Sequence, residues 1–161
     1  MKVKFILLYP MKIFNKTIKL KSKGEMDFID LTDEAIEFVR ESKIKDGLLT
    51  VHSKHTTMAI RVNESEKGIR HDMREFVKRL APKDVYYHHN DLEIRTENLV
   101  CDKDASDCIN GHSHCIHFLM GSSESIPVIG GNLALGQWQR IFALELDCSR
   151  DREIIMLLMG E

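Results

Sequence analysis

Three histidines in this sequence occupy positions from which imidazole chemistry could be performed. His55 ends a strand-like segment and is followed by Thr56 and Thr57, whose hydroxyls and backbone N–H groups suit an anion. His89 falls in a long polar stretch, and His114 falls in an amphipathic one. Neutral imidazoles are frequent metal ligands, and three of them leave a fourth position on zinc open for water or substrate. These histidines are therefore candidate ligands of a divalent metal.

The helix expected from about Asp107 to Met120 places its histidines on two faces. One face combines apolar residues with one histidine: Ile109, His112, Ile116 and Met120. The opposite face is polar and ends in a glycine: Asn110, His114, His117 and Gly121. We therefore expect His112 in the core with a hydrogen-bond partner, and His114 beside a polar site with Asn110 one turn before it.

Charged residues near the C-terminus could support such a site. Glu145 lies in a mostly apolar row of the strand expected over 138–146, so it is either a surface residue or a ligand, base or partner of a histidine. Arg150 and Arg152 follow a turn and are two residues apart, so in an extended segment their side chains would point to the same side. Guanidinium groups suit bidentate phosphate binding, although surface ion pairs with nearby aspartates are the alternative.

The hydrophobic periodicity predicts short strands interspersed with helices. Strands are expected over residues 12–21, 28–31, 48–55, 58–63, 126–129, 133–135, 138–146 and 153–159. Helices are expected from the caps Thr32 and Ser65, with the third running to Met120. Gly130, Gly131 and Asn132 predict a hairpin turn. The polar stretch over 83–106 is longer than most loops in a compact domain, which favours a function for it.

The second helix carries one further candidate, Asp72. Its apolar stripe is formed by Ile69, Met73, Phe76, Val77 and Leu80. At helical spacing Asp72 lies on the edge of that stripe and can face a site, whereas His71 points away from it toward water.

Length and composition fit one globular domain. The chain has 161 residues, 43% hydrophobic and 30% charged, and its net charge of −2 gives no sign of a nucleic-acid partner. No segment is long and apolar enough to predict a membrane span. Residues 1–10 are expected to be an extension outside a core domain of 11–161. The four cysteines form no CxxC pair, so free thiols in a reducing cytoplasm are expected.

Several short motifs follow one another in an order that resembles the YjbQ family, also called secondary thiamine-phosphate synthases. They are His55-Thr56-Thr57, Asn63-Glu64, Arg70-His71-Asp72, Tyr87-His88-His89-Asn90, Asn110 to His114, Ile126-Pro127-Val128, Leu135 to Gln139, and Glu145-Leu146-Asp147 with Arg150 and Arg152. The resemblance covers residues 11–161. It implies a single compact α+β domain with mixed, mostly antiparallel sheets and about three helices, commonly assembled as a homotrimer.

Family members are credited with weak thiamine-phosphate synthase activity, which joins a pyrimidine diphosphate to a thiazole phosphate and releases pyrophosphate. By matching motifs, His55, His89 and His114 correspond to histidines of the family's polar pocket, and a one-residue shift would replace His89 by His88. Our hypothesis assigns the three histidines to a metal ion. Catalytic or supporting roles fall to Glu145, Asp72 and Glu64. Binding of the phosphorylated substrate falls to Thr56, Thr57, Asn110, Gln139, Arg150 and Arg152.

The sequence departs from the family pattern in three places. Met58 stands where a small residue is usual, Gln137 replaces a threonine, and Cys148-Ser149 replaces a turn that commonly contains glycine. Gln137 and Cys148 are expected to alter the rim of the pocket and with it the ligand preference. Histidine ligands suit zinc or another transition metal, while magnesium would accompany pyrophosphate oxygens. A metal-dependent hydrolase of a phosphorylated metabolite and a non-enzymatic metal- or metabolite-binding trimer remain alternative functions.

Overall fold

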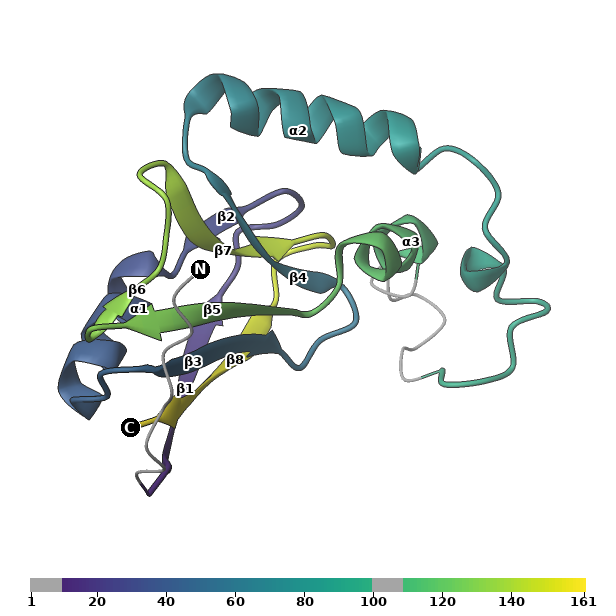
Figure 1. Ribbon diagram of the computed structural model, residues 1–161. Coiled ribbons are helices and arrows are strands. Elements are labelled where there is room, and N and C mark those ends of the chain that lie inside the picture. Colours follow the sequence, from purple (N-terminus) through teal and green to yellow (C-terminus); the bar gives the residue numbers. More distant parts are fainter. Residues whose placement is uncertain (1–9, 100–108) are drawn as a thin grey trace, which may run out of the picture.

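The structure is a computed structural model that describes residues 10–99 and 109–161. Predictions that fall on residues 1–9, on Cys101 and Cys108, and on a helix start at Asp107 lie outside this part of the chain. Figure 1 shows two sheets, with one helix across the smaller sheet and others at the ends of the molecule.

The larger sheet has five antiparallel strands. β8 (Asp151–Gly160) lies between β1 (Lys12–Lys21) and β3 (Gly47–Ser53), and it pairs with both along most of its length. β5 (Ser123–Ile129) and β6 (Asn132–Leu133) complete the order β1-β8-β3-β5-β6. Every second residue along most of β8 is buried, so one face of this sheet covers the core.

The smaller sheet has three antiparallel strands in the order β2-β7-β4. β7 (Gln139–Glu145) lies between β2 (Phe28–Asp30) and β4 (Met58–Glu64). Consecutive residues of β7 are buried from Ile141 onward, which means that both of its faces are covered. The larger sheet covers one face, and the helices over Lys67–Leu80 and Gly111–Met120 cover the other.

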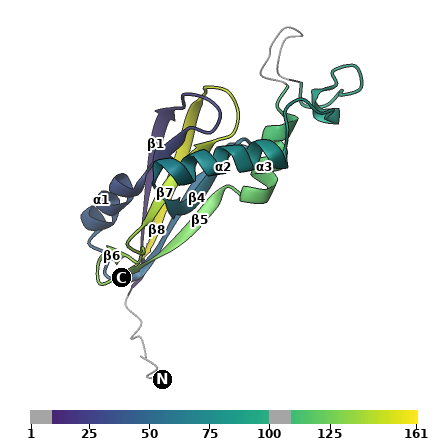
Figure 2. The same ribbon diagram turned by 90° about the horizontal axis from the view of Figure 1, so that it is seen from above.

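The described ranges contain three α-helices and one 3₁₀ turn. They are α1 (Thr32–Ser42), α2 (Lys67–Leu80), η1 (His88–Asn90) and α3 (Gly111–Met120). Figure 2 shows α2 lying across the smaller sheet, where its Val77 packs with Ala59 of β4 and Leu144 of β7. No helix in these ranges is long and apolar enough to cross a membrane.

Between α2 and α3 the chain forms an arm, residues 83–99, that contains η1. Both views show the arm extending away from the two sheets, beyond the end of α3 (Figures 1 and 2). Outside η1 it has no regular element, as the polar sequence of this stretch predicts. Its η1 contacts the N-terminus of α3, and the candidate site lies at this contact.

The expected single α+β domain is confirmed, and the main corrections concern helix starts. Thr32 is not an N-cap, because its Oγ1 accepts a hydrogen bond from Ile141 N at 2.8 Å. Asp30 Oδ1 accepts from Thr32 N instead. Ser65 is not the cap of α2 either, since the carboxylate of Glu66 accepts from the backbone N–H groups at the start of that helix. Acidic side chains thus replace the predicted hydroxyls.

The division of α3 into two faces is confirmed for His112, which is buried and lies within hydrogen-bond distance of Ser113 Oγ. Ile116 is buried beside it on the same face. Ile109 is a correction, because the helix begins only at Gly111 and Ile109 is exposed before it. Once a residue precedes the helix, helical periodicity no longer assigns its direction.

Neighbouring leucines of β3 provide a test of the core assignment. Leu49 is 0% exposed, while the adjacent Leu48 is 37% exposed and lies on the opposite face. We expect Leu49→Ala to lower the free energy of unfolding by about 2–5 kcal/mol, because it removes buried contacts and leaves a cavity. Leu48→Ala is the matched control in urea denaturation. Equal losses for the two variants would contradict the assigned face.

Candidate functional site

His89 and His114 meet at a cavity of about 760 Å³ between the arm and α3. Their ring centroids lie 4.5 Å apart, with the rings tilted by 56°. The cavity is lined by Thr56, His88, His89, Ile94, Arg95, Thr96, Glu97, Asn98 and His114. Two of the three predicted histidines and one predicted threonine therefore share one cavity.

A close contact at the N-terminus of α3 places His89 beside His114. Asn90 Oδ1 accepts a hydrogen bond from Gly111 N at 2.8 Å. A methyl group at Gly111 would lie 2.8 Å from Tyr87 Cβ, a distance that real side chains do not adopt. Glycine therefore allows the arm to approach the helix closely.

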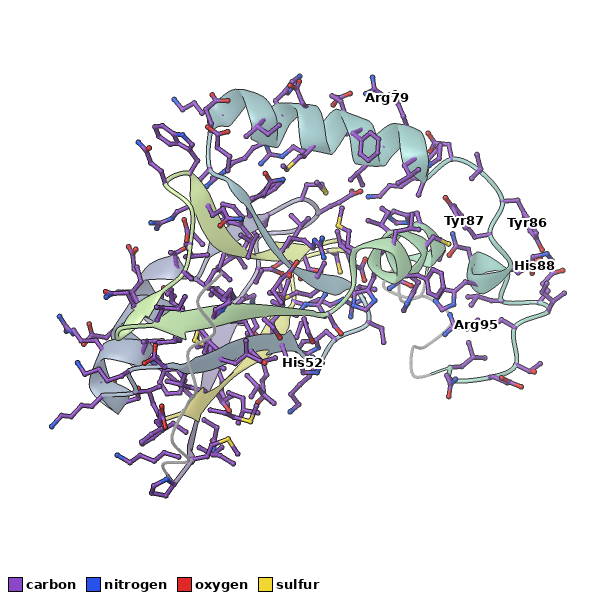
Figure 3. The ribbon with its side chains drawn as sticks, in the orientation of Figure 1. His52, Arg79, Tyr86, Tyr87, His88 and Arg95 are labelled. Carbon is purple, nitrogen blue, oxygen red and sulfur yellow. The ribbon has the colours of Figure 1, made fainter. Side chains whose placement is uncertain are left out.

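Arg95 gives the arm its shape and brings a positive charge to the cavity. Its Nη1 donates to His89 O at 3.2 Å, and its other donors reach the carbonyl oxygens of Glu97 and Asn98. Figure 3 shows Arg95 reaching back from the arm toward α3, and both His88 and His89 line the cavity. Sequence reasoning missed Arg95, although it singled out the polar stretch that contains it.

The pocket histidines are electrically neutral at neutral pH. Burial lowers the pKa of His89, and the nearby Arg95 charge lowers it further, against a hydrogen bond to Asn110 that raises it. Burial also lowers the pKa of His114, followed by the effect of His89. Both rings therefore present lone pairs that can accept a proton or bind a metal ion.

His55 has a different environment from the other two histidines. Its Nε2 accepts a hydrogen bond from Glu153 N at 2.8 Å, which extends the β3–β8 ladder past Ser53 through a side chain. The neutral ring must then carry its proton on Nδ1. Burial lowers the pKa of His55, and the Arg152 charge adds to this effect. His55 is thus engaged as a backbone partner in this arrangement.

Glu145, Arg152 and Thr57 form a buried network that joins the two sheets. Glu145 is 0% exposed and Arg152 is 4% exposed, and the two form an ion pair in which Arg152 Nε donates to Glu145 Oε2 at 2.6 Å. Arg152 Nη2 donates to Thr57 Oγ1, and Ser22 Oγ donates to Glu145 Oε2. These groups saturate one another, so the structure places them in a sheet junction.

Asn110 links the pocket to Asp147 and Arg150. Asn110 Nδ2 donates to Asp147 Oδ2 at 2.7 Å, and Asn110 Oδ1 lies 3.0 Å from His89 Nε2. Arg150 Nη2 donates to the same Asp147 oxygen at 2.8 Å. Burial raises the pKa of Asp147, but the hydrogen bond from Asn110 and the Arg150 charge outweigh it and bring the pKa below 3.8. Arg150 therefore has a carboxylate partner.

Three predicted site residues lie elsewhere. Glu64 and Gln139 pair at one end of the β4–β7 ladder, whereas Glu145 pairs with Met58 at the other end. Gln139 Oε1 accepts from Gly136 N in a turn, and Glu64 is exposed. Asp72 is exposed on α2, and so is His71, as expected. The structure therefore does not bring Glu64, Gln139 and Asp72 to the histidine cavity of the same chain.

The fit of a metal ion depends on which histidines converge. Across residues 10–99 and 109–161, no group of three His, Cys, Asp or Glu side chains is placed to hold a metal ion. The set of His55, His89 and His114 does not fit as arranged, because His55 Nε2 already accepts from Glu153. The pair of His89 and His114 fits two ligand positions, with the others left to water or to oxygens of a bound molecule.

The buried ion pair gives a stability prediction. Arg152→Met leaves Glu145 buried without its charge partner, so we expect a loss of about 3–5 kcal/mol in the free energy of unfolding. Adding Glu145→Gln removes the uncompensated charge and should recover part of that loss. Chemical denaturation of the single and double variants measures both effects. A loss below about 1 kcal/mol in the single variant would contradict the junction role.

His55 gives a prediction about pH. Its folded pKa lies below the ordinary value of 6.5, so the unfolded chain binds its proton first as pH falls. Stability should therefore decrease as the pH falls below about 6.5, the ordinary pKa of histidine. In His55→Gln, whose side-chain oxygen can still accept from Glu153 N, the decrease in melting temperature should be smaller. The same decrease in both proteins would show that His55 contributes nothing to it.

Comparisons with known proteins agree on one family. Residues 16–161 match the family model described as UPF0047 protein YjbQ-like. A UPF0047 protein of Archaeoglobus fulgidus is 37% identical over 86% of this chain and 96% of its own length. One from Methanothermobacter thermautotrophicus is 31% identical over 94% of this chain and 95% of its own length.

Solved structures show the same fold. A crystal structure of a protein of unknown function from Sulfolobus solfataricus P2 has a TM-score of 0.82 and 29% identity, and covers 94% of this chain and 100% of that one. A hypothetical protein from Aeropyrum pernix K1 has a TM-score of 0.78 and 31% identity, over 92% of this chain and 99% of that one. The chain therefore belongs to the YjbQ family of UPF0047 proteins.

Proposed function

We propose that the cavity between the arm and α3 binds a phosphorylated small molecule and that the chain is a thiamine-phosphate synthase-like transferase. The observation that carries the proposal is the convergence of two neutral imidazoles and one guanidinium, those of His89, His114 and Arg95, on a single cavity of about 760 Å³. The family resemblance supports the reaction. The cavity is large enough for a substrate of this size.

The proposed reaction makes clear what the site must do. A ring nitrogen of a thiazole phosphate attacks the carbon that bears the diphosphate of the pyrimidine, the C–O bond breaks, and pyrophosphate leaves with the bonding electrons. No protein nucleophile is needed. The site must hold the two rings in line and stabilise the departing polyanion. Arg95 supplies a fixed positive charge, and Thr56 also lines the cavity.

A divalent metal, zinc or another transition metal, is proposed to bind at His89 and His114. When bound, it would supply positive charge to phosphate oxygens. Imidazole nitrogens favour these ions over magnesium, which would enter with the oxygens of pyrophosphate. His55, which precedes Thr56 in the chain, is proposed to hold β8 at Glu153 and not to act as a ligand.

The proposal includes a homotrimer in the cytoplasm. Apolar side chains that lack cover within one chain support an assembly, above all on the arm and α3: Val85, Tyr86, Ile94, Leu99, Phe118 and Leu119. Phe118 is 88% exposed, which is unusual for a phenylalanine in a monomer. Cys115 and Cys148 are free thiols, as expected in a reducing compartment.

His114→Ala tests the site directly. Losing a charge-assisted contact of about 1.5–3 kcal/mol should weaken pyrophosphate binding about 10- to 100-fold and lower the bound metal. His71→Ala, on the exposed face of α2, is the matched control. Calorimetry measures the pyrophosphate affinity of both variants, and elemental analysis measures their bound metal. Unchanged binding and metal content in His114→Ala would overturn the proposed site.

The reaction is tested on the same proteins with a pyrimidine diphosphate and a thiazole phosphate. Thiamine phosphate formed by the wild type and lost in His114→Ala supports the transferase. Release of inorganic phosphate from either substrate alone would instead indicate a hydrolase, and tight binding without turnover would indicate a binding module.

A further inference from the structure

The amide of Asn110 lies between a carboxylate and a pocket imidazole. Asn110 is 7% exposed and precedes the first residue of α3, while Asp147 is 8% exposed in the connection between β7 and β8. Asn110 Nδ2 donates to Asp147 Oδ2 at 2.7 Å, and Asn110 Oδ1 lies 3.0 Å from His89 Nε2. Three polar groups from three separate segments thus form one chain of contacts.

The chemistry of these groups fixes the direction of each hydrogen bond. An ionised carboxylate only accepts, so the NH₂ of Asn110 must face Asp147. The amide oxygen then faces His89, and since it also only accepts, His89 Nε2 must carry a hydrogen and donate it. In the neutral ring the lone pair is consequently left on Nδ1.

Arg95 also affects which ring nitrogen of His89 carries the hydrogen. Its Nη1 lies 3.1 Å from the same His89 Nε2, and a guanidinium only donates. Arg95 would therefore favour a lone pair on Nε2, which is the opposite tautomer. With Asn110 in place, Arg95 donates to His89 O instead. Two neighbours thus favour opposite tautomers of one ring, and the contact on the side that Asp147 supports is the shorter, at 3.0 Å against 3.1 Å.

We propose that Asp147 is a positioning residue that sets the tautomer of His89 through Asn110 and keeps Nδ1 as its lone-pair nitrogen. The proposal rests on the proposed function in one respect, that His89 faces the ligand. A ring held in this way can take up a metal ion or a proton through Nδ1 without first rearranging. Carboxylates that orient histidine ligands have this effect on metal sites in general.

The nearby charges are compatible with this role. Arg150 donates to the same Asp147 oxygen through Nε at 3.1 Å and Nη2 at 2.8 Å, which favours the ionised, accepting form. Asp147 N donates to Glu145 Oε1 at 3.1 Å, which fixes the backbone. Asp147 is therefore held by Asn110, Arg150 and Glu145. A carboxylate fixed in this way can hold the Asn110 amide in one orientation.

Nitrogen NMR of the metal-free protein tests the proposal without any ligand. At about pH 8, where imidazoles are neutral, we expect His89 of the wild type to carry its proton on Nε2. In Asp147→Asn the side chain can face Asn110 with either oxygen or NH₂, so Asn110 can turn and Nε2 can accept from Asn110 or Arg95. We expect a population with the proton on Nδ1 to appear. Asp151→Asn, at an exposed carboxylate, is the matched control.

Asn110→Ala guards against a folding defect, because it leaves the Asp147–Arg150 pair intact and removes only the bridge. It should shift the His89 tautomer in the same direction. With Zn²⁺ as the probe, both variants should bind about 10- to 100-fold more weakly than the wild type. A wild-type proton on Nδ1, or an unchanged tautomer in both variants, would overturn the positioning role.

The two proposals fail in different ways. A wild type that binds neither Zn²⁺ nor pyrophosphate argues against the proposed function, whereas the tautomer shift in the variants still supports the role of Asp147. Normal Zn²⁺ binding in variants whose tautomer has shifted overturns the claim that the tautomer matters to the ligand.

Discussion

The ion pair between Glu145 and Arg152 is the contact on which the rest of this structure depends. It joins the last residue of β7 to the second residue of β8, and so connects the smaller sheet to the larger one. Burying two charges is costly unless every polar atom is satisfied, and Ser22, Thr57 and Asp147 N supply the remaining partners. The junction thus fixes how the sheets meet and where the β7–β8 connection begins.

Hydrogen bonds connect this junction to the residues of the candidate site. Asp147 follows Glu145 by two residues and holds Asn110, which lies at the start of α3 and contacts His89. His55 lies beside the junction and holds β8 through Glu153 N. Buried polar groups therefore run continuously from the sheet junction to the cavity, and each has a partner that restricts its orientation. Such support keeps functional side chains in place when they are mounted on an irregular segment.

Much of the fold could be predicted from the sequence because burial follows a local period. The strands, the two faces of α3 and the separation of His112 from His114 all arise from that period. The pairing of Glu145 with Arg152 could not be predicted, since it depends on how two sheets pack and not on spacing. An arginine that could bind a phosphate can equally form an ion pair with a buried carboxylate, and the sequence does not distinguish the two. Arg95 was missed for a related reason, because an aperiodic segment gives no direction to its side chains.

The arm forms most of the candidate cavity and lies apart from the two sheets. Seven of the nine residues that line the cavity belong to the arm, which contributes no strand to either sheet. Substitutions there can change the shape and charge of the cavity at little cost to the core, provided that the contact at Gly111 and the hydrogen bonds of Arg95 are kept. Relatives with the same scaffold are thus free to diverge in ligand choice through this one stretch, which makes it the natural place to look for subfamilies.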